Sequence, residues 1–167
     1  MAVVAVKGFA ITNRDSSPKV INDAAHANAS MKGFVGAAAI TSGNSVGSTY
    51  LLGSIPSNAI VHSLLASSSA DMGTTTTANI GLYKTTADGG AVVDADFFKA
   101  TLDLKGGAIT NTEVANGNVI TLANSYKKVY ELLGLTSDPC IQYDVVATLD
   151  GACDGSGVLQ LKCQYAI

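Results

Sequence analysis

Tryptophan is absent from this chain of 167 residues, and aromatic and charged residues are both scarce. Aromatic residues make up 6% of the sequence and charged residues 14%, whereas charged residues are about a quarter of an average soluble domain. Ala, Gly, Ser, Thr and Val fill the deficit. Because exposed helix faces normally carry many Glu and Lys residues, this composition argues against an all-α protein. It favours many short strands joined by turns of small residues.

Cysteine is also rare, and Cys140, Cys153 and Cys163 are widely spaced. An odd number at such spacing is neither a disulfide framework nor a zinc knuckle, so we expect free thiols in a chain made in a reducing cytoplasm. We expect no secretory signal, since the opening MAVVAV is too short for an apolar signal region and Lys7 follows it. The longest apolar run, residues 34–40, is far below the roughly 18 residues of a membrane span.

The known motifs of catalysis and ligand binding are missing as well. We find no P-loop and no GxGxxG, GxSxG or HExxH pattern. His26 and His62 are far apart, which predicts isolated side chains rather than metal ligands. The loop from Asp150 to Asp154 is acidic, but it lacks EF-hand spacing, so a calcium site there is a minor alternative. We therefore expect no catalytic residue, no metal site and no cofactor, and the dispersed tyrosines predict no platform for stacking bases.

The stretch NIGLYKTTADGGAVVDADFFKATLDL, residues 79–104, is the part of the chain around which we expect the other strands to be arranged. Residues 79–84 alternate apolar and polar side chains, as a strand with one buried face does. The sequence Asp88-Gly89-Gly90 predicts a tight turn, because these residue types tolerate positive φ. A second alternating run follows at 101–104. The stretch therefore predicts an antiparallel β unit on which the flanking strands pack.

A short capped element is predicted between these two runs. Asp94 is a good N-cap, and Asp96 would lie in the first turn of a short helix over residues 95–99. The two carboxylates could instead hold a cation or act as an acid/base pair. Capping explains both residues, so we interpret them as structural.

Alternating or β-branched runs predict further strands at residues 47–55, 59–66, 119–122, 141–149 and 158–167. The glycine-rich loop at 150–157 predicts a hairpin of the last two. Asn124-Ser125 predicts the start of a helix over 126–133, which ends at Gly134. About eight short strands at this spacing predict an all-β antiparallel β-sandwich or jelly roll with one short helix.

Residues 1–46 show no clear period and predict an extended N-terminal arm outside a sandwich domain of residues 47–167. Within the arm we expect a short strand at 3–6 and some helix near 22–31. We also expect residues 37–40 to pair with another strand, and one alternative is that this strand belongs to another subunit. The arm carries four basic and two acidic residues, a charge of +2, whereas the remainder carries six lysines and eleven carboxylates, a charge of −5. Scattered cations do not predict nucleic-acid binding.

Two interpretations of the arm stay open: a flexible terminus, or a segment that becomes ordered on a partner. The second interpretation makes its apolar and basic side chains the candidate contacts. These are Val3, Val4, Val6, Lys7, Phe9, Ile11, Arg14, Lys19, Lys32, Phe34 and Ile40.

Several runs of the chain together resemble one protein family. The runs are GSTYLLGSIPSNA at 47–59, NIGLY at 79–83, GAVVDADFF at 90–98, YELLGL at 130–135 and YDVVATL at 143–149. They resemble the small jelly-roll head decoration, or cement, proteins of tailed bacteriophages. The resemblance covers residues 47–167 and not the arm, its motifs are structural, and the three cysteines depart from the pattern.

The resemblance implies a structural protein of the virion, not an enzyme, that binds the outside of the phage head after synthesis in the host cytoplasm. Its implied partners are the major capsid protein, whose neighbouring subunits it would bridge, and other copies of itself in a dimer or trimer. Nucleic acid, membrane and small-molecule substrates are not implied. The alternative function is that of a receptor- or glycan-binding tail or fibre protein, which would need a recessed patch of aromatic and carboxylate groups. An enzyme is a third and weaker reading.

Overall fold

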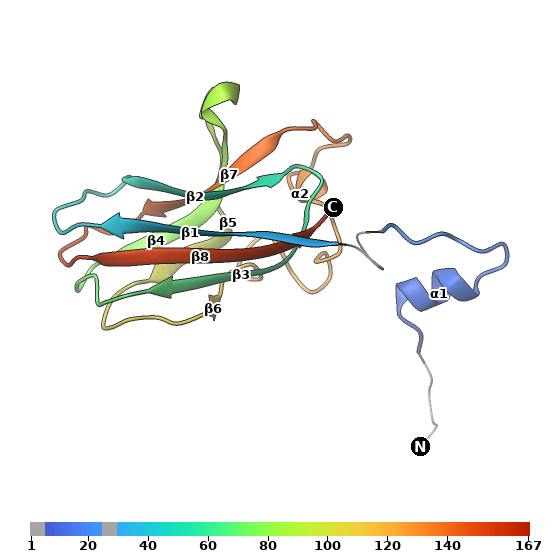
Figure 1. Cartoon of the computed structure of the whole chain (residues 1–167), viewed down its shortest axis with the longest axis horizontal. Coiled ribbons are helices and arrows are strands. Elements are labelled where there is room, and N and C mark those ends of the chain that lie inside the picture. Colours follow the sequence, from blue (N-terminus) through green and yellow to red (C-terminus); the bar gives the residue numbers. More distant parts are fainter. Residues whose placement is uncertain (1–5, 25–29) are drawn as a thin grey trace, which may run out of the picture.

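The computed structural model describes residues 6–24 and 30–167, and within them eight strands form two antiparallel sheets of four strands that pack face to face (Figure 1). This confirms the expected all-β sandwich. The strands are β1 (Met31–Ile40), β2 (Thr49–Pro56), β3 (Ile60–Ser68), β4 (Thr77–Lys84), β5 (Val92–Asp103), β6 (Thr112–Glu113), β7 (Gln142–Leu149) and β8 (Gly157–Ala166). Two short α-helices, α1 (Phe9–Asp15) and α2 (Val129–Leu132), and a 3-10 turn, η1 (Thr86–Asp88), complete the elements.

The strand order follows a simple rule. One sheet has the order β1-β8-β3-β6 and the other has the order β2-β7-β4-β5. The first strand therefore pairs with the last, the second with the seventh, the third with the sixth and the fourth with the fifth, always antiparallel. This nesting is the order produced by rolling one long hairpin onto itself, as in an eight-stranded jelly roll. The central β4–β5 hairpin is the β unit predicted over residues 79–104.

The core lies between the sheets and is centred on two neighbouring phenylalanines. Phe97 and Phe98 are both fully buried, with ring centroids 4.9 Å apart at 85°. Consecutive strand residues normally point to opposite faces, but β5 bulges here. Leu82 pairs with Asp94 and Ile80 with Lys99, so four residues of β5 oppose Gly81 alone. A Cβ at Gly81 would lie 2.3 Å from the Ala95 backbone, so the bulge requires glycine there.

The bulge replaces the short helix predicted over residues 95–99, and that prediction is wrong. The motif that predicted an N-cap instead makes a local turn, in which the Asp96 N–H donates to Asp94 Oδ1 at 3.2 Å. Partial burial and, next, the neighbouring Asp96 raise the pKa of Asp94 above its ordinary value. The burial of both aromatic rings therefore determines the local structure here, and the N-capping pattern does not.

The predicted boundary at residue 46 is also wrong. Met31–Ile40 form β1, which pairs with β8 from Met31–Ala166 to Ile40–Gly157. The partner of residues 37–40 is thus the C-terminal strand of the same chain and not another subunit. Alternate side chains of β1 face the core, and Ile40 is buried. The period was hard to see in the sequence because glycine and alanine occupy half of the strand.

Other local expectations are corrected too. The predicted strand at 119–122 is a series of turns, and the helix over 126–133 is shortened to α2. The strands at 141–149 and 158–167 exist as β7 and β8, but they lie in different sheets, so loop 150–157 crosses between sheets rather than closing a hairpin. Of the strand expected at 3–6, only Val6 is described, and it is not in a strand. The centre of the helix expected near 22–31 also lies outside the described residues, and the described part of that range is not helical.

The two sheets approach closely at the edge formed by β1 and β2. A Cβ placed on Gly36 would lie 1.5 Å from the Leu52 carbonyl oxygen. Leu52 sits where the register of β2 shifts against β7. The bulged backbone of one sheet therefore rests on the glycine of the other, and no side chain fits between them.

We predict that Gly36→Ala destabilises the fold. The added methyl group must push β1 away from the Leu52 carbonyl, and such overpacking typically costs about 1–3 kcal/mol of unfolding free energy. Gly8→Ala is the matched control, because nothing lies within 4 Å of a Cβ there. Urea unfolding of both variants measures the difference, and equal midpoints would contradict the close contact.

We also predict that one thiol of three reacts in the native protein. Cys140 is exposed, whereas Cys153 and Cys163 are buried and free. Burial, with a smaller effect of Glu113, raises the pKa of Cys163 to about 12, which suppresses the reactive thiolate. Titration with a chromogenic disulfide should give one fast thiol in buffer and three in denaturant. Two or three fast thiols in buffer would contradict this packing.

Candidate interaction surface

Residues 6–24 fold into a small unit beside one end of the sandwich (Figure 1). Helix α1 is short and buries no residue. The chain after it turns back, because Asn13 Nδ2 donates to Asn22 Oδ1 at 2.9 Å and Asn22 Nδ2 donates to the Ala10 carbonyl at 3.1 Å. A helix of two turns has little stability of its own, so these amide contacts give the unit its shape.

An aromatic contact and an ion pair are among the interactions that connect the described part of this unit to the sandwich. The ring of Phe9 in α1 lies 6.0 Å from that of Tyr126, with the planes tilted by 45°. Asp23 pairs with Lys128 at 3.0 Å, and this hydrogen bond is the main cause that raises the pKa of Lys128. Both partners on the body belong to the segment that leads into α2. The aromatic contact and the ion pair thus both hold the N-terminal unit against this one segment of the body.

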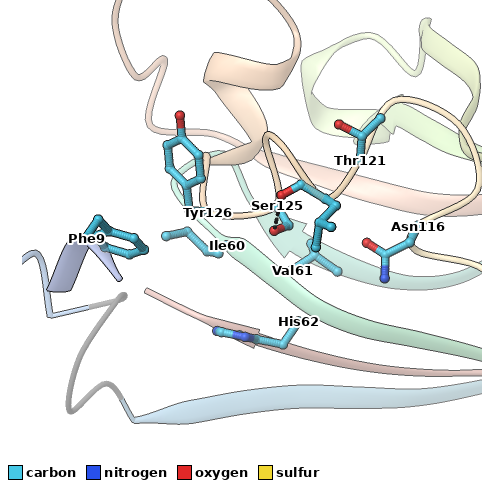
Figure 2. A pocket seen from close by; sticks show the side chains of 9 residues that line it. Phe9, Ile60, Val61, His62, Asn116, Thr121, Ser125 and Tyr126 are labelled. Carbon is cyan, nitrogen blue, oxygen red and sulfur yellow. Dashed lines mark hydrogen bonds between the residues drawn. The ribbon is translucent and has the colours of Figure 1, made fainter. Parts of the chain in front are cut away.

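A hollow of about 660 Å³ opens between α1 and the body, and Figure 2 shows its lining. Phe9 and Tyr126 stand at one end, while the start of β3 forms the floor. The hollow is lined by Phe9, Ile60, Val61, His62, Asn116, Thr121, Leu122, Ser125 and Tyr126. The lining combines apolar side chains with neutral polar groups and one imidazole, and it contains no carboxylate.

The segment before α2 lines one side of the hollow. Backbone hydrogen bonds hold the end of this segment beside the start of β3. The N–H groups of Val129 and Tyr130 donate to the carbonyls of Ala59 and Ser57, both at 2.9 Å. This holds the first turn of α2 against the turn between β2 and β3. Asn124 closes the preceding loop, since its Oδ1 accepts from the Thr121 N–H at 2.6 Å and its Nδ2 donates to the Val119 carbonyl at 2.9 Å. Asn124-Ser125, predicted as a helix start, thus shapes a turn.

Two basic side chains of the N-terminal unit share one carboxylate within the unit. Lys7 Nζ lies 2.9 Å from Asp15 Oδ2, and Arg14 Nε lies 2.7 Å from Asp15 Oδ1. Hydrogen bonds from Arg14 first, and then from Lys7, lower the pKa of Asp15. Lys19 and Lys32 make no ion pair with any described residue, and they remain available as positive charges. Because Asp15 supplies a single negative charge, the group of Lys7, Arg14 and Asp15 keeps a net positive charge, as the sequence count already implies.

The structure separates the predicted contact residues into three groups. Phe34 packs against the core and Ile40 is buried in β1, so neither is available to a partner; Lys32 is exposed on the same strand. Val3 and Val4 lie outside the described residues. The others are brought together on the N-terminal unit, where all are exposed: Val6, Lys7, Phe9, Ile11, Arg14 and Lys19.

Sequence reasoning missed the body side of this surface. Ile60 was assigned to a strand, and Leu122 to a strand that does not exist, so neither was considered as a contact. The only available signal was TLANSYKK, residues 121–128, in which two large apolar side chains stand within a polar, turn-forming run. That pattern does not identify which distant segment lies opposite.

Within the described ranges, no three His, Cys, Asp or Glu side chains gather as metal ligands. His26 is outside those ranges, and His62 lines the hollow. Asp94 and Asp96 stand together, without a third candidate ligand. Among the helices described, none is long and apolar enough to cross a membrane.

Comparison with known proteins gives no family match, since no family model and no curated protein matches the chain. Two solved structures are similar in fold. A chain of the cyanophage Pam1 capsid asymmetric unit is 13% identical, with a TM-score of 0.48 over 92% of this chain and 96% of that chain. A chain of the acid-stable capsid of Helicobacter pylori bacteriophage KHP30 is 17% identical, with a TM-score of 0.40 over 81% of this chain and 87% of that chain.

We predict that Asp23→Asn loosens the N-terminal unit. An ion pair this exposed contributes at most about 1 kcal/mol, so trypsin should cleave after Lys19 up to a few-fold faster. Asp88→Asn in η1 is the control for a distant carboxylate. High salt should bring the wild-type rate towards that of Asp23→Asn, because salt screens exposed charges. Identical rates for all three proteins in low salt would contradict a role of the Asp23–Lys128 pair.

Proposed function

We propose that this chain is a structural protein of a phage virion that decorates the outside of the head and stabilises contacts between major capsid subunits. One observation carries the proposal: the N-terminal unit presents apolar side chains to water beside a sandwich whose core is complete without it. The fully buried residues of the main core begin at Ile40, and the partly buried side chains packed against them begin at Phe34, so residues 6–24 contribute to neither group. Val6 is 88% exposed and Ile21 is 94% exposed.

Such side chains are costly to leave in water and gain free energy when a partner covers them. Burying a valine or isoleucine side chain contributes on the order of 1–3 kcal/mol, from which the entropy of ordering the segment must be subtracted. Val6, Val20 and Ile21 lie on both sides of α1, and Lys19 adds a charge that favours one orientation on the partner. The segment thus has the chemistry of an attachment element.

A capsid surface suits this attachment because it repeats. Each copy needs only modest affinity if several copies are linked on one shell, since linkage makes later binding steps effectively intramolecular. Added interface across subunit joints strengthens a shell under internal pressure. The rigid sandwich would then be the exterior part of the decoration. The resemblance of residues 47–167 to head decoration proteins supports the same assignment.

The glycan-binding alternative has less support on this surface. The hollow beside α1 offers the rings of Phe9 and Tyr126 and the hydroxyls of Thr121 and Ser125, but its lining contributes no carboxylate. A recessed patch of aromatic and carboxylate groups was the requirement for that function.

We predict that deleting residues 2–30 leaves a folded sandwich that no longer binds heads. The deletion ends before Met31, because removing β1 would take away an entire strand. Thermal melting of the free protein should stay close to that of the full chain, and co-sedimentation with undecorated heads should be lost. The control is Leu51→Ser on β2, an exposed apolar side chain of the sandwich, which should bind heads like the full chain.

Three results would count against the proposal in different ways. If the shortened chain binds heads as well as the full chain, the N-terminal segment is not the attachment element. If the shortened chain does not fold, the segment belongs to the core. If the full chain itself fails to bind any head of its phage, the decoration function is wrong.

A further inference from the structure

The floor of the hollow is unusual for the outer face of a sheet. Ile60 and Ala166 pair across β3 and β8 and form a small buried cluster that is separate from the main core. Their neighbour Val61 belongs to the main core, so Ile60 and Ala166 face the opposite side, away from the other sheet. Outer faces of antiparallel sheets usually carry polar side chains in water. This end of the outer face is dry and apolar instead.

The chain's own helix covers this place only partly. Phe9 reaches the hollow but remains 52% exposed, and α1 buries none of its residues. Leu122 stands on the rim with 96% of its side chain exposed. The apolar side chains left in water at this place are therefore Phe9 of the helix and Leu122 and Tyr126 on the rim of the hollow, whereas Ile60 beneath them is already buried.

The charges of helix α1 and of the hollow are also compatible with contact between them. The lining of the hollow contains no acidic residue and no lysine or arginine. In α1, Arg14 is paired with Asp15, which also pairs with Lys7 just before the helix. A strongly charged partner would lose solvation here without gaining an ion pair, whereas α1 itself meets the hollow without repulsion.

The segment between α1 and β1 is long enough for α1 to bind a neighbouring copy of the chain instead of its own body. Residues 16–30 join α1 to β1, and 15 residues span up to about 50 Å when extended. That length exceeds the distance across one small domain, so α1 can reach a neighbouring copy. The Phe9–Tyr126 contact shows that the surfaces fit chemically.

We propose that the hollow is a docking site for α1 of a second copy of this chain. The donor helix places Phe9 against Tyr126 of the acceptor and covers Leu122, which is 96% exposed in the single copy. Because the helix and the hollow are different surfaces, the contact is heterologous: two copies can exchange helices reciprocally, or several can link head to tail. This self-association does not depend on head binding, so the purified protein alone tests it.

The test mixes two complementary variants. Phe9→Asp disables the helix and leaves the body side of the hollow unchanged, whereas Leu122→Asp disables the body side of the hollow and leaves the helix unchanged. Leu51→Asp, at an exposed apolar position on β2, is the control. Sedimentation velocity at up to roughly 100 μM, where a contact with a Kd of about 10 μM is mostly formed, measures the mass of each protein and of the equimolar mixture.

We expect the full chain and Leu51→Asp to self-associate, and the Phe9→Asp and Leu122→Asp variants to be monomers when alone. Their mixture should form a one-to-one complex and stop there, since only one intact helix and one intact hollow remain. A full chain that stays monomeric at all these concentrations would overturn the proposal. So would variants that associate unchanged, or a mixture that stays monomeric while the full chain associates. Circular dichroism of each variant confirms that loss of association is not loss of fold.

Discussion

The pairing of β1 with β8 is the interaction on which the rest of this structure depends. Ten residues near the start of the chain align with ten residues at its end, from Met31–Ala166 to Ile40–Gly157. Once this outermost pair is fixed, the pairs inside it follow in nested order. Such long-range pairing is expensive in loop entropy, so it must be supported by burial along the whole strand. Inward side chains such as Ile40 and Leu161 provide that support.

The same pairing sets the place where the N-terminal segment leaves the body. Because Met31 lies opposite Ala166, the chain before it emerges beside the end of β8 and the start of β3. At that end Ile60 and Ala166 form their separate apolar cluster, and the loop carrying Leu122 and Tyr126 stands next to it. The attachment segment and the hollow are therefore neighbours as a consequence of strand order. Capsid attachment and helix exchange, as proposed, use different parts of one segment: the residues flanking α1 and the helix itself.

The sequence was informative where burial alternates clearly. The class of fold, the central β unit and six of the strands could be predicted from periodicity. It was uninformative where small residues hide the period, as in β1, since Gly36 and Ala38 contribute little hydrophobic signal although both face inward. At Asp94 the N-capping pattern predicted a short helix that does not form, because the burial of Phe97 and Phe98 imposes a bulge there. The placement of β7 and β8 in different sheets depends on strand pairing that no local pattern encodes.

On the surface, exposed apolar residues of the N-terminal segment could be recognised as candidates, but their partners on the body could not. Ile60 and Tyr126 are 66 positions apart, and only the folded loop brings them to one hollow. Charge counting also could not show that two cations of the segment, Lys7 and Arg14, share the carboxylate of Asp15. The net charge of a segment governs its long-range attraction, whereas such local pairs decide which side chains can contact a partner.

Hydrogen exchange of the protein, free and bound to heads, tests the central claim most directly. The claim is that residues 6–24 are an attachment element and that residues 31–40 belong to the core. The account predicts fast exchange of backbone amides over 6–24 in the free monomer and strong protection on the head, with β1 amides paired to β8 protected in both states. Fast exchange over 6–24 in both states, or gain of protection confined to the sandwich, would contradict it.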